Sequence, residues 1–173
     1  MALPITGYFS NAARTKGEIK TALEDQRDEV QSPCKGMRAY KSSGSDSIAN
    51  WPTWTGPIGL QTESYDILNE FDVATAVFTA SRAGTYDVVC ALCFAANTTV
   101  SEREVAIFAN GAFYSSGMFH GGNINRPTVV GHHDRVKLAI GGTLDLRGRQ
   151  ATGGAVTTDL TFVTFLSIQR ISD

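Results

Sequence analysis

Residues 84–95, GTYDVVCALCFA, are the stretch that decides the fold. Successive side chains of a β-strand point to opposite faces of the sheet, and here both faces are apolar. One face carries Tyr86, Val88, Cys90, Leu92 and Phe94, and the other carries Val89, Ala91, Cys93 and Ala95. An antiparallel sheet with one face in water alternates apolar with polar residues instead. We therefore expect something to cover the second face of this strand.

Residues 160–171 show the same two-sided pattern near the C-terminus. Leu160, Phe162, Leu166 and Ile168 fall on one face, and Val163, Phe165 and Ile171 fall on the other. In one small sandwich, another copy of the chain is the favoured cover, with loops or an N-terminal helix as the alternative. The candidate interface residues are accordingly Val89, Ala91, Cys93, Val163 and Phe165.

The remainder of residues 51–173 predicts a single all-β head domain. Candidate strands are 58–62, 65–69, 73–79, 84–95, 104–109, 112–116, 128–131, 134–139, 143–150 and 160–171. Gly, Asn and Ser turn signals separate them at short intervals, as is typical of a sandwich or barrel. Asn110-Gly111 is the sharpest hairpin signal, because both residues accept the positive φ of a type I′ turn. Residues 33–50 are rich in Ser, Gly and Lys and predict a linker, with room for one edge strand at 37–41.

Residues 16–32 predict a short helical stalk. Thr15 and Glu18 have the spacing of a capping box, and Pro33 ends the run because proline cannot continue a helix. Ile19, Leu23, Gln26 and Val30 follow a 4-3-4 spacing, which is that of a short coiled-coil seam. A helix of about four turns is marginal alone. It must pack on the head or on copies of itself, and the narrow apolar stripe favours the second.

Composition excludes several classes of function. The chain has 173 residues with a net charge of −2 and no run of Lys or Arg, so nucleic-acid binding is not expected. Residues 2–7 lack the features of a signal peptide, and no apolar run reaches the ~18–20 residues of a membrane span. We therefore expect a product made in a cytoplasm without membrane insertion. The chain has three cysteines, an odd and small number that does not suit a disulfide framework, so reduced thiols are expected.

No catalytic or metal-binding constellation stands out. Cys90 and Cys93 have a zinc-like spacing, but residues three apart on a strand point to opposite faces, so neither a metal nor a cofactor is expected. His120, His132 and His133 have no nucleophile or paired acid beside them in sequence, so an enzyme is not expected. A turn at 118–127 offers Phe119, His120, Asn123 and Asn125 as ligand-facing candidates, although an ordinary long turn is the favoured interpretation. For Trp51 and Trp54, anchoring the chain is favoured over stacking on a sugar.

Several stretches of the head resemble the C1q/TNF-like superfamily. They are Phe71-Asp72, 77–79 (VFT), 84–86 (GTY), the hairpin at 105–111 (VAIFANG), 136–146 (VKLAIGGTLDL) and 162–166 (FVTFL). Together they span about residues 58–171 in the family's order. The resemblance implies a ten-strand jelly roll that packs as a homotrimer, with the candidate interface residues lining the threefold axis. Gly142 replaces the family's aspartate and Thr164 its closing glycine, so a calcium site of the family type is not expected.

The N-terminus carries a second resemblance. Residues 4–15 (PITGYFSNAART), 17–18 and 22–28 are similar to the opening of tail-fibre-type proteins of tailed bacteriophages. This implies that residues 1–15 attach to other virion proteins, with Ile5, Tyr8, Phe9 and Arg14 as docking candidates. The expected function is that of a homotrimeric tail fibre or receptor-binding appendage, made in the bacterial host cytoplasm, whose head meets a host-surface glycan or protein. A trimeric capsid decoration or head-fibre protein is the alternative, and a carbohydrate-binding module outside the virion is a third.

Overall fold

The computed structural model describes residues 36–99, 101–121, 125–161 and 163–172. The chain divides into two compact units at residue 34, and all described residues belong to the second, Lys35–Asp173. The stalk predicted at 16–32 and the attachment segment predicted at 1–15 lie outside the described residues. So do the seam and docking residues Ile19, Leu23, Gln26, Val30, Ile5, Tyr8, Phe9 and Arg14.

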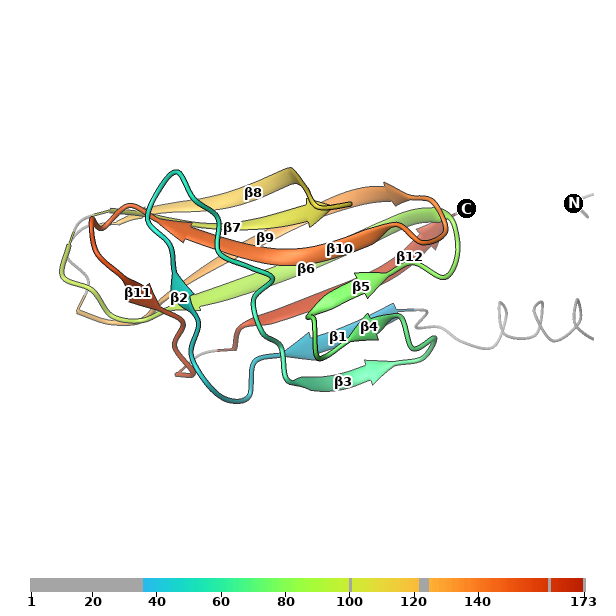
Figure 1. The fold of residues 1–173 in the computed structure, drawn as a ribbon, viewed down its shortest axis with the longest axis horizontal. Helices are drawn as coiled ribbons and strands as arrows, with labels where there is room; N and C mark the ends of the chain where they lie inside the picture. Colours follow the sequence, from blue (N-terminus) through green and yellow to red (C-terminus); the bar gives the residue numbers. More distant parts are fainter. Residues whose placement is uncertain (1–35, 100, 122–124, 162, 173) are drawn as a thin grey trace, which may run out of the picture. The chain divides into compact units, whose positions relative to one another are not determined.

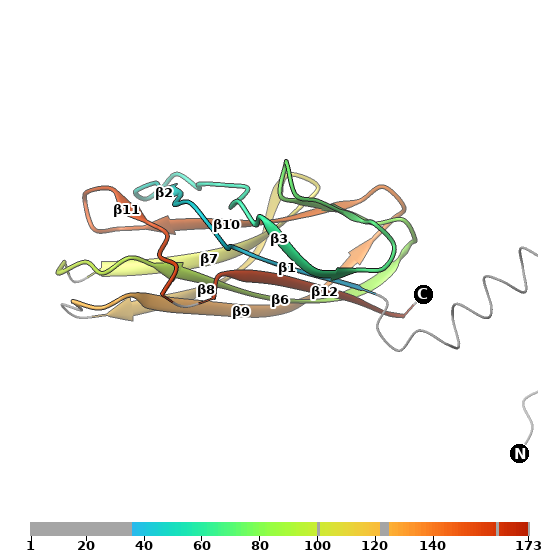
Figure 2. The same cartoon turned by 90° about the horizontal axis from the view of Figure 1, so that it is seen from below.

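Two five-stranded sheets form the described unit, in the orders β3-β1-β12-β6-β9 and β4-β5-β10-β7-β8, with a small β11-β2 pair beside them (Figure 1). The strands are β1 (Gly36–Tyr40), β2 (Ser47–Ile48), β3 (Thr62–Asp66), β4 (Phe71–Asp72), β5 (Val77–Thr79), β6 (Gly84–Phe94), β7 (Ser101–Ala109), β8 (Ala112–Gly121), β9 (Thr128–Leu138), β10 (Thr143–Gln150), β11 (Val156–Thr157) and β12 (Phe165–Ser172). Figure 2 shows β12, β6 and β9 in one layer and β7 and β10 in the other. The prediction of a mainly β sandwich is confirmed.

The core lies between the two sheets and is built from alternate residues of their strands. On β6 these are Tyr86, Val88, Cys90, Leu92 and Phe94, all buried, as the alternation predicted. Their partners include Val105 and Ile107 of β7 and Leu144 and Leu146 of β10. The Phe78 and Tyr86 rings meet edge to face with centroids 5.5 Å apart. Burial of this inner face is the main stabilising term of the fold.

The turn chemistry at 110–111 is confirmed. Asn110 and Gly111 have φ of 52° and 75° and join β7 to β8. The predicted pair of strands at 128–131 and 134–139 is instead one continuous strand, β9. Gly131, His132 and His133 remain in register with β6 and make no turn. His132 faces the other sheet and His133 faces outward, and neither interrupts the pairing of β9 with β6.

The predicted linker at 33–50 differs most from the structure. Residues 36–50 contain β1 and β2, and β1 is an interior strand between β3 and β12. Met37, Ala39 and Ile48 belong to the core. The head therefore includes residue 36, and the boundary at 51 falls inside it. Only two inward-facing apolar residues support β1, and the polar loop that follows it dominates the local composition.

The final strand is shorter than predicted. It begins at Phe165 rather than at residue 160. Asp159 and Thr164, which precede it, are hydrogen-bonded to Cys93 near the end of β6. Thr158 pairs with Phe94 in an isolated bridge, and the backbone amide of Lys41 donates to the Thr164 carbonyl at 2.9 Å. Leu160 and Val163 therefore lie outside the strand, and we call residues 158–161 and 163–164 the crossing segment.

Candidate functional site

The outward face of the β3-β1-β12-β6-β9 sheet carries the candidate interface residues. Pairing places Phe165 of β12 opposite Ala91 of β6, so the two side chains share that face. Val89 is 37% exposed and Val163 is 55% exposed, while Phe165 is half-buried. Val129 of β9, opposite Cys93, is also exposed. These residues leave an apolar surface on an otherwise complete sandwich, and we call Val89, Val129, Val163 and Phe165 the apolar face.

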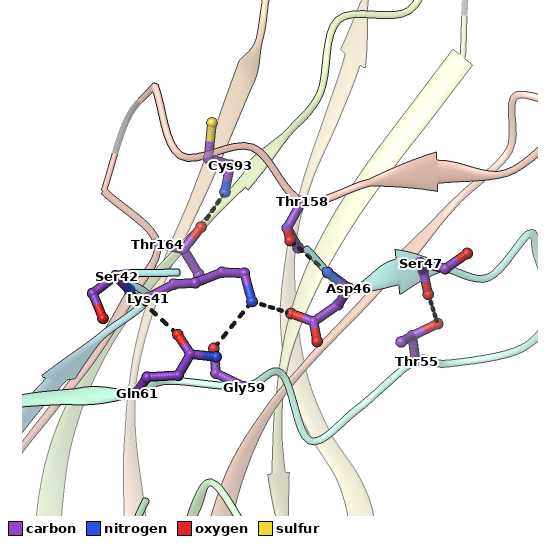
Figure 3. Close-up of polar contacts among 10 residues, drawn as sticks. All are labelled: Lys41, Ser42, Asp46, Ser47, Thr55, Gly59, Gln61, Cys93, Thr158 and Thr164. Atoms are coloured by element: carbon purple, nitrogen blue, oxygen red, sulfur yellow. Dashed lines mark hydrogen bonds and ion pairs between the residues drawn. The ribbon is translucent and has the colours of Figure 1, made fainter. Parts of the chain in front are cut away.

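Cys93 does not contribute to this surface. It is fully buried, and Ala91 is largely buried. The Cys93 amide donates to Thr164 Oγ1 at 2.9 Å (Figure 3). The amide of Asp159 donates to the Cys93 carbonyl at 3.0 Å. Part of the second face of β6 is thus covered by the chain's own crossing segment, which is the alternative that the sequence left open. The remaining part, around Val89, stays uncovered in one copy of the chain.

Charged side chains lie beside Val89 and Phe165 of the apolar face. Asp87 accepts hydrogen bonds from His133 Nε2 at 2.9 Å and from Arg135 Nε at 3.4 Å. The hydrogen bond from His133 holds the pKa of Asp87 below its usual range, with Arg135 acting in the same direction. The Arg38 guanidinium lies 4.5 Å from the centre of the Phe165 ring. An apolar centre with a polar rim is the arrangement found at protein–protein interfaces.

A buried ion pair fixes the crossing segment. Lys41 Nζ lies 2.8 Å from Asp46 Oδ2 and donates to the Gly59 carbonyl at 3.5 Å (Figure 3). The amide of Asp46 donates to Thr158 Oγ1 at 2.8 Å. Because the ammonium is almost fully buried, these contacts must offset its desolvation. The network joins the loop after β1, the segment around Gly59 and the chain that leads to Val163.

The predicted ligand-facing turn at 118–127 is only partly a turn, because its first residues, up to Gly121, belong to strand β8. Phe119 and His120 lie in β8, which continues to Gly121 because β7 begins at Ser101 and keeps it paired. Phe119 is opposite Arg103 on the inward face, whereas His120 is on the outward face with Nδ1 3.7 Å from a Glu102 oxygen. Asn125 is exposed, and Asn123 lies outside the described residues. Phe119 and His120 therefore do not combine into one site.

A serine beside a histidine was missed from the sequence. Ser115 of β8 and His132 of β9 meet across the two sheets, with Oγ and Nε2 2.9 Å apart. A hydrogen bond with Ser115 also holds the pKa of Asp134 below its usual range. In a catalytic triad the carboxylate binds the imidazole and the imidazole binds the serine. Here both groups bind the serine, so the cluster joins two sheet edges and lacks the relay that activates a nucleophile.

The two cysteines of β6 behave as packed thiols. Neither Cys90 nor Cys93 forms a disulfide, and their side chains lie on opposite faces of the strand. Burial raises the pKa of Cys90 to about 12. Within the described ranges, no group of three or more His, Cys, Asp or Glu residues is placed to hold a metal ion. The same residues include no helix long and apolar enough to cross a membrane.

Aromatic side chains gather on the outward face of the other sheet. The Trp54 ring stacks on Phe113 at 5.7 Å and 28° and meets Phe108 edge-on at 5.6 Å. Trp54 thus packs on the head, in agreement with the anchoring role predicted for it. Trp51 differs, because 57% of its surface remains exposed.

Comparisons with known proteins identify the fold. No family model and no curated protein matches the chain. Among solved structures, the globular domain of zebrafish complement 1qA protein matches with TM-score 0.58 and 10% identity, over 79% of this chain and 97% of that one. Eiger TNF from S. frugiperda matches with TM-score 0.59 and 11% identity, over 82% of this chain and 95% of that one. Murine APRIL matches with TM-score 0.54 and 11% identity, over 79% of this chain and 98% of that one.

These likenesses establish the class of fold. At 10–11% identity they concern architecture alone. The described residues form a C1q/TNF-like jelly roll, so the fold implied by the sequence resemblance is confirmed.

Proposed function

We propose that the protein is a non-enzymatic, homotrimeric structural component of a bacteriophage virion, acting as a tail fibre or receptor-binding appendage. Its N-terminal residues attach to other virion proteins, and its jelly-roll head faces a host-surface glycan or protein. The observation that carries the trimer is the apolar face around Val89 and Phe165. The similarity of residues 4–28 to tail-fibre-type proteins supports the virion context.

The physical case for self-association rests on the cost of exposed apolar area. Each Å² of apolar surface removed from water contributes roughly 25 cal/mol. Val89, Val129 and Val163 are exposed, and Phe165 is half-buried. C1q- and TNF-type domains pack as homotrimers, and the outward face of this sheet is the natural counterpart surface here. Obligate interfaces bury on the order of 2,000–5,000 Å², so the apolar face would form only their centre.

Threefold assembly also suits attachment to a host. Three identical weak sites on one particle raise avidity by about 10²–10⁴ when they bind together. A non-enzymatic protein achieves strong attachment by this geometry, without needing a deep pocket. The trimer is therefore the functional unit in this proposal.

Light scattering on the purified full chain tests the assembly. We expect a mass three times that of the 18.6 kDa chain. Phe165→Asp places a carboxylate in the apolar face and should dissociate the trimer, whereas Ile140→Asp, at a 72% exposed turn position, should leave it intact. A wild-type mass of 18.6 kDa would contradict the proposed trimer.

Immunogold labelling of phage particles tests the position on the virion. Gold at the tail tip would support the appendage. Gold on the capsid faces would replace it with the second candidate, a trimeric capsid decoration or head-fibre protein that uses the same assembly. Absence of the protein from particles would contradict both.

A further inference from the structure

The outward face of the β4-β5-β10-β7-β8 sheet carries an ordered stack of aromatic rings and guanidinium groups. The guanidinium of Arg149 lies 4.1 Å from the Trp54 ring centre and 5.9 Å from that of Trp51. That of Arg147 lies 4.0 Å from the Phe108 ring centre. Trp54 in turn stacks on Phe113. We call Trp51, Trp54, Phe108, Phe113 and Arg149 the aromatic platform.

The platform combines fixed inner rings with open outer ones. Phe108 is buried and Trp54 half-buried, so both have little freedom to move. Trp51 is 57% exposed and Phe113 is 52% exposed, so both offer ring surface to a ligand. Rigid aromatic rings supply contact area at low entropic cost, because few rotamers are lost on binding.

Carboxylates neutralise both arginines of this face. Arg149 Nε donates to Glu104 Oε2 at 2.6 Å, and Ser116 Oγ donates to Glu104 Oε1 at 2.6 Å. Arg147 donates two hydrogen bonds to Asp145, from Nε to Oδ1 at 2.6 Å and from Nη2 to Oδ2 at 3.1 Å. The side chains of Glu104 and Arg149 are only 6% and 19% exposed, so the pair is held in place. The face is thus rich in hydrogen-bonding groups while its charges cancel.

We infer that the aromatic platform binds a neutral saccharide. A pyranose ring has an apolar face of C–H groups that packs on an aromatic ring, and a rim of hydroxyls that needs fixed donors and acceptors. Trp51 supplies the ring. The guanidinium of Arg149, 5.9 Å from the Trp51 ring centre and held by Glu104 through Nε, supplies the fixed donors. Because the charges cancel and the chain carries −2 overall, an acidic polymer would gain little from this face.

The inference rests on the proposed function for its host context, although the platform itself lies within one copy of the chain. The aromatic platform and the apolar face lie on outward faces of different sheets. Association through the apolar face would therefore leave the platform facing away from the partner subunits. Three copies of one weak saccharide site would then act together.

An array of immobilised neutral and acidic saccharides, probed with the labelled full chain, tests the inference. We expect binding to neutral saccharides, with titration of the strongest one giving at least a tenfold loss of affinity for Trp51→Ala and for Phe113→Ala. Arg149→Lys keeps the charge but loses the planar fork, and should also weaken binding. Ile67→Ala removes an exposed apolar side chain from the turn after β3 and should leave affinity unchanged.

Three results would overturn the inference: no neutral saccharide bound, binding to acidic saccharides only, or affinity unchanged in Trp51→Ala. Circular dichroism and light scattering on each variant separate loss of the platform from loss of the fold or of the assembly. A monomer that binds neutral saccharide through Trp51 would contradict the trimer but keep the platform. A trimer that binds no neutral saccharide would support the proposed assembly and contradict the saccharide site.

Discussion

His132 Nε2 lies 2.9 Å from Ser115 Oγ, and this contact joins the edge strands of the two sheets. Ser115 belongs to β8 and His132 to β9, and each strand lies at the end of its own sheet. Polar side chains at this seam replace the apolar contacts found elsewhere between the layers. The seam is therefore held by hydrogen bonds whose loss can be measured.

Ser115→Ala should destabilise the head by about 1 kcal/mol, the usual net contribution of an intramolecular hydrogen bond. The substitution removes the partner of His132 and also a hydrogen bond that Asp134 accepts. Urea unfolding should show a lower midpoint with an unchanged slope. Ser45→Ala, in an exposed loop, is the matched control and should shift the midpoint little. Equal midpoints for the two variants would show that the seam contact adds nothing.

Stability should fall as the pH drops through the range in which aspartates take up protons. The pKa values of Asp87, Asp134 and Asp159 lie below their ordinary value in the folded chain, because each accepts side-chain hydrogen bonds. A carboxyl with a depressed folded pKa contributes stability above its unfolded pKa, and loses it as the pH falls through the folded pKa. Thermal unfolding measured from about pH 6 to about pH 3, the range in which aspartates titrate, follows this loss. Asp87→Asn should flatten the curve, and an unchanged slope would contradict the role of Asp87.

Arg103→Met should stabilise the protein. Arg103 is 0% exposed, and none of its three guanidinium nitrogens has a hydrogen-bond partner within the described part of the chain. Burial of this charge is costly, and it lowers the pKa of the group. Replacement of buried charges by apolar residues of similar volume has stabilised other proteins by roughly 1–4 kcal/mol.

Calorimetry should accordingly show a higher Tm for Arg103→Met than for the wild type. Arg103→Lys keeps a buried charge and serves as the control, which should show no gain. A lower Tm for the methionine variant would indicate that the guanidinium is paired in the assembled protein.

Cys90 should not react with Ellman's reagent in the folded protein. Burial raises the pKa of its thiol to about 12, so the reactive thiolate is scarce at pH 8, which is about the pH of such assays. A Cys34→Ser background restricts the signal to Cys90 and Cys93, which are both buried. We expect reaction only after denaturation. Rapid labelling of the native protein would show that this end of β6 opens.

The alternation of β6 was readable from the sequence because side-chain direction along a strand has a period of two. The inner face from Tyr86 to Phe94 is buried as expected, and the Asn110-Gly111 hairpin has the predicted positive φ values. The limits of β10, Thr143–Gln150, are also those predicted. Each of these features depends only on neighbours along the chain.

Features that depend on a partner strand were not readable. β1 rests on only two inward apolar residues, Met37 and Ala39, and becomes an interior strand because β3 and β12 flank it. Phe119 and His120 were placed in a turn, but β7 extends far enough to keep them in β8. In both cases hydrogen bonds to a distant segment outweigh the local composition.

By itself, the sequence determined a sandwich whose strands have known inner and outer faces, and an apolar residue at Val89 that needs cover. Only the tertiary structure decided which outer residues meet. It buried Cys93 under the crossing segment, joined Ser115 to His132, and placed Trp54 on Phe113 beside an open Trp51. The reason is physical. Side-chain alternation is a local property of the backbone, whereas the neighbour of a strand is chosen by packing and hydrogen bonding among segments that lie far apart in the chain.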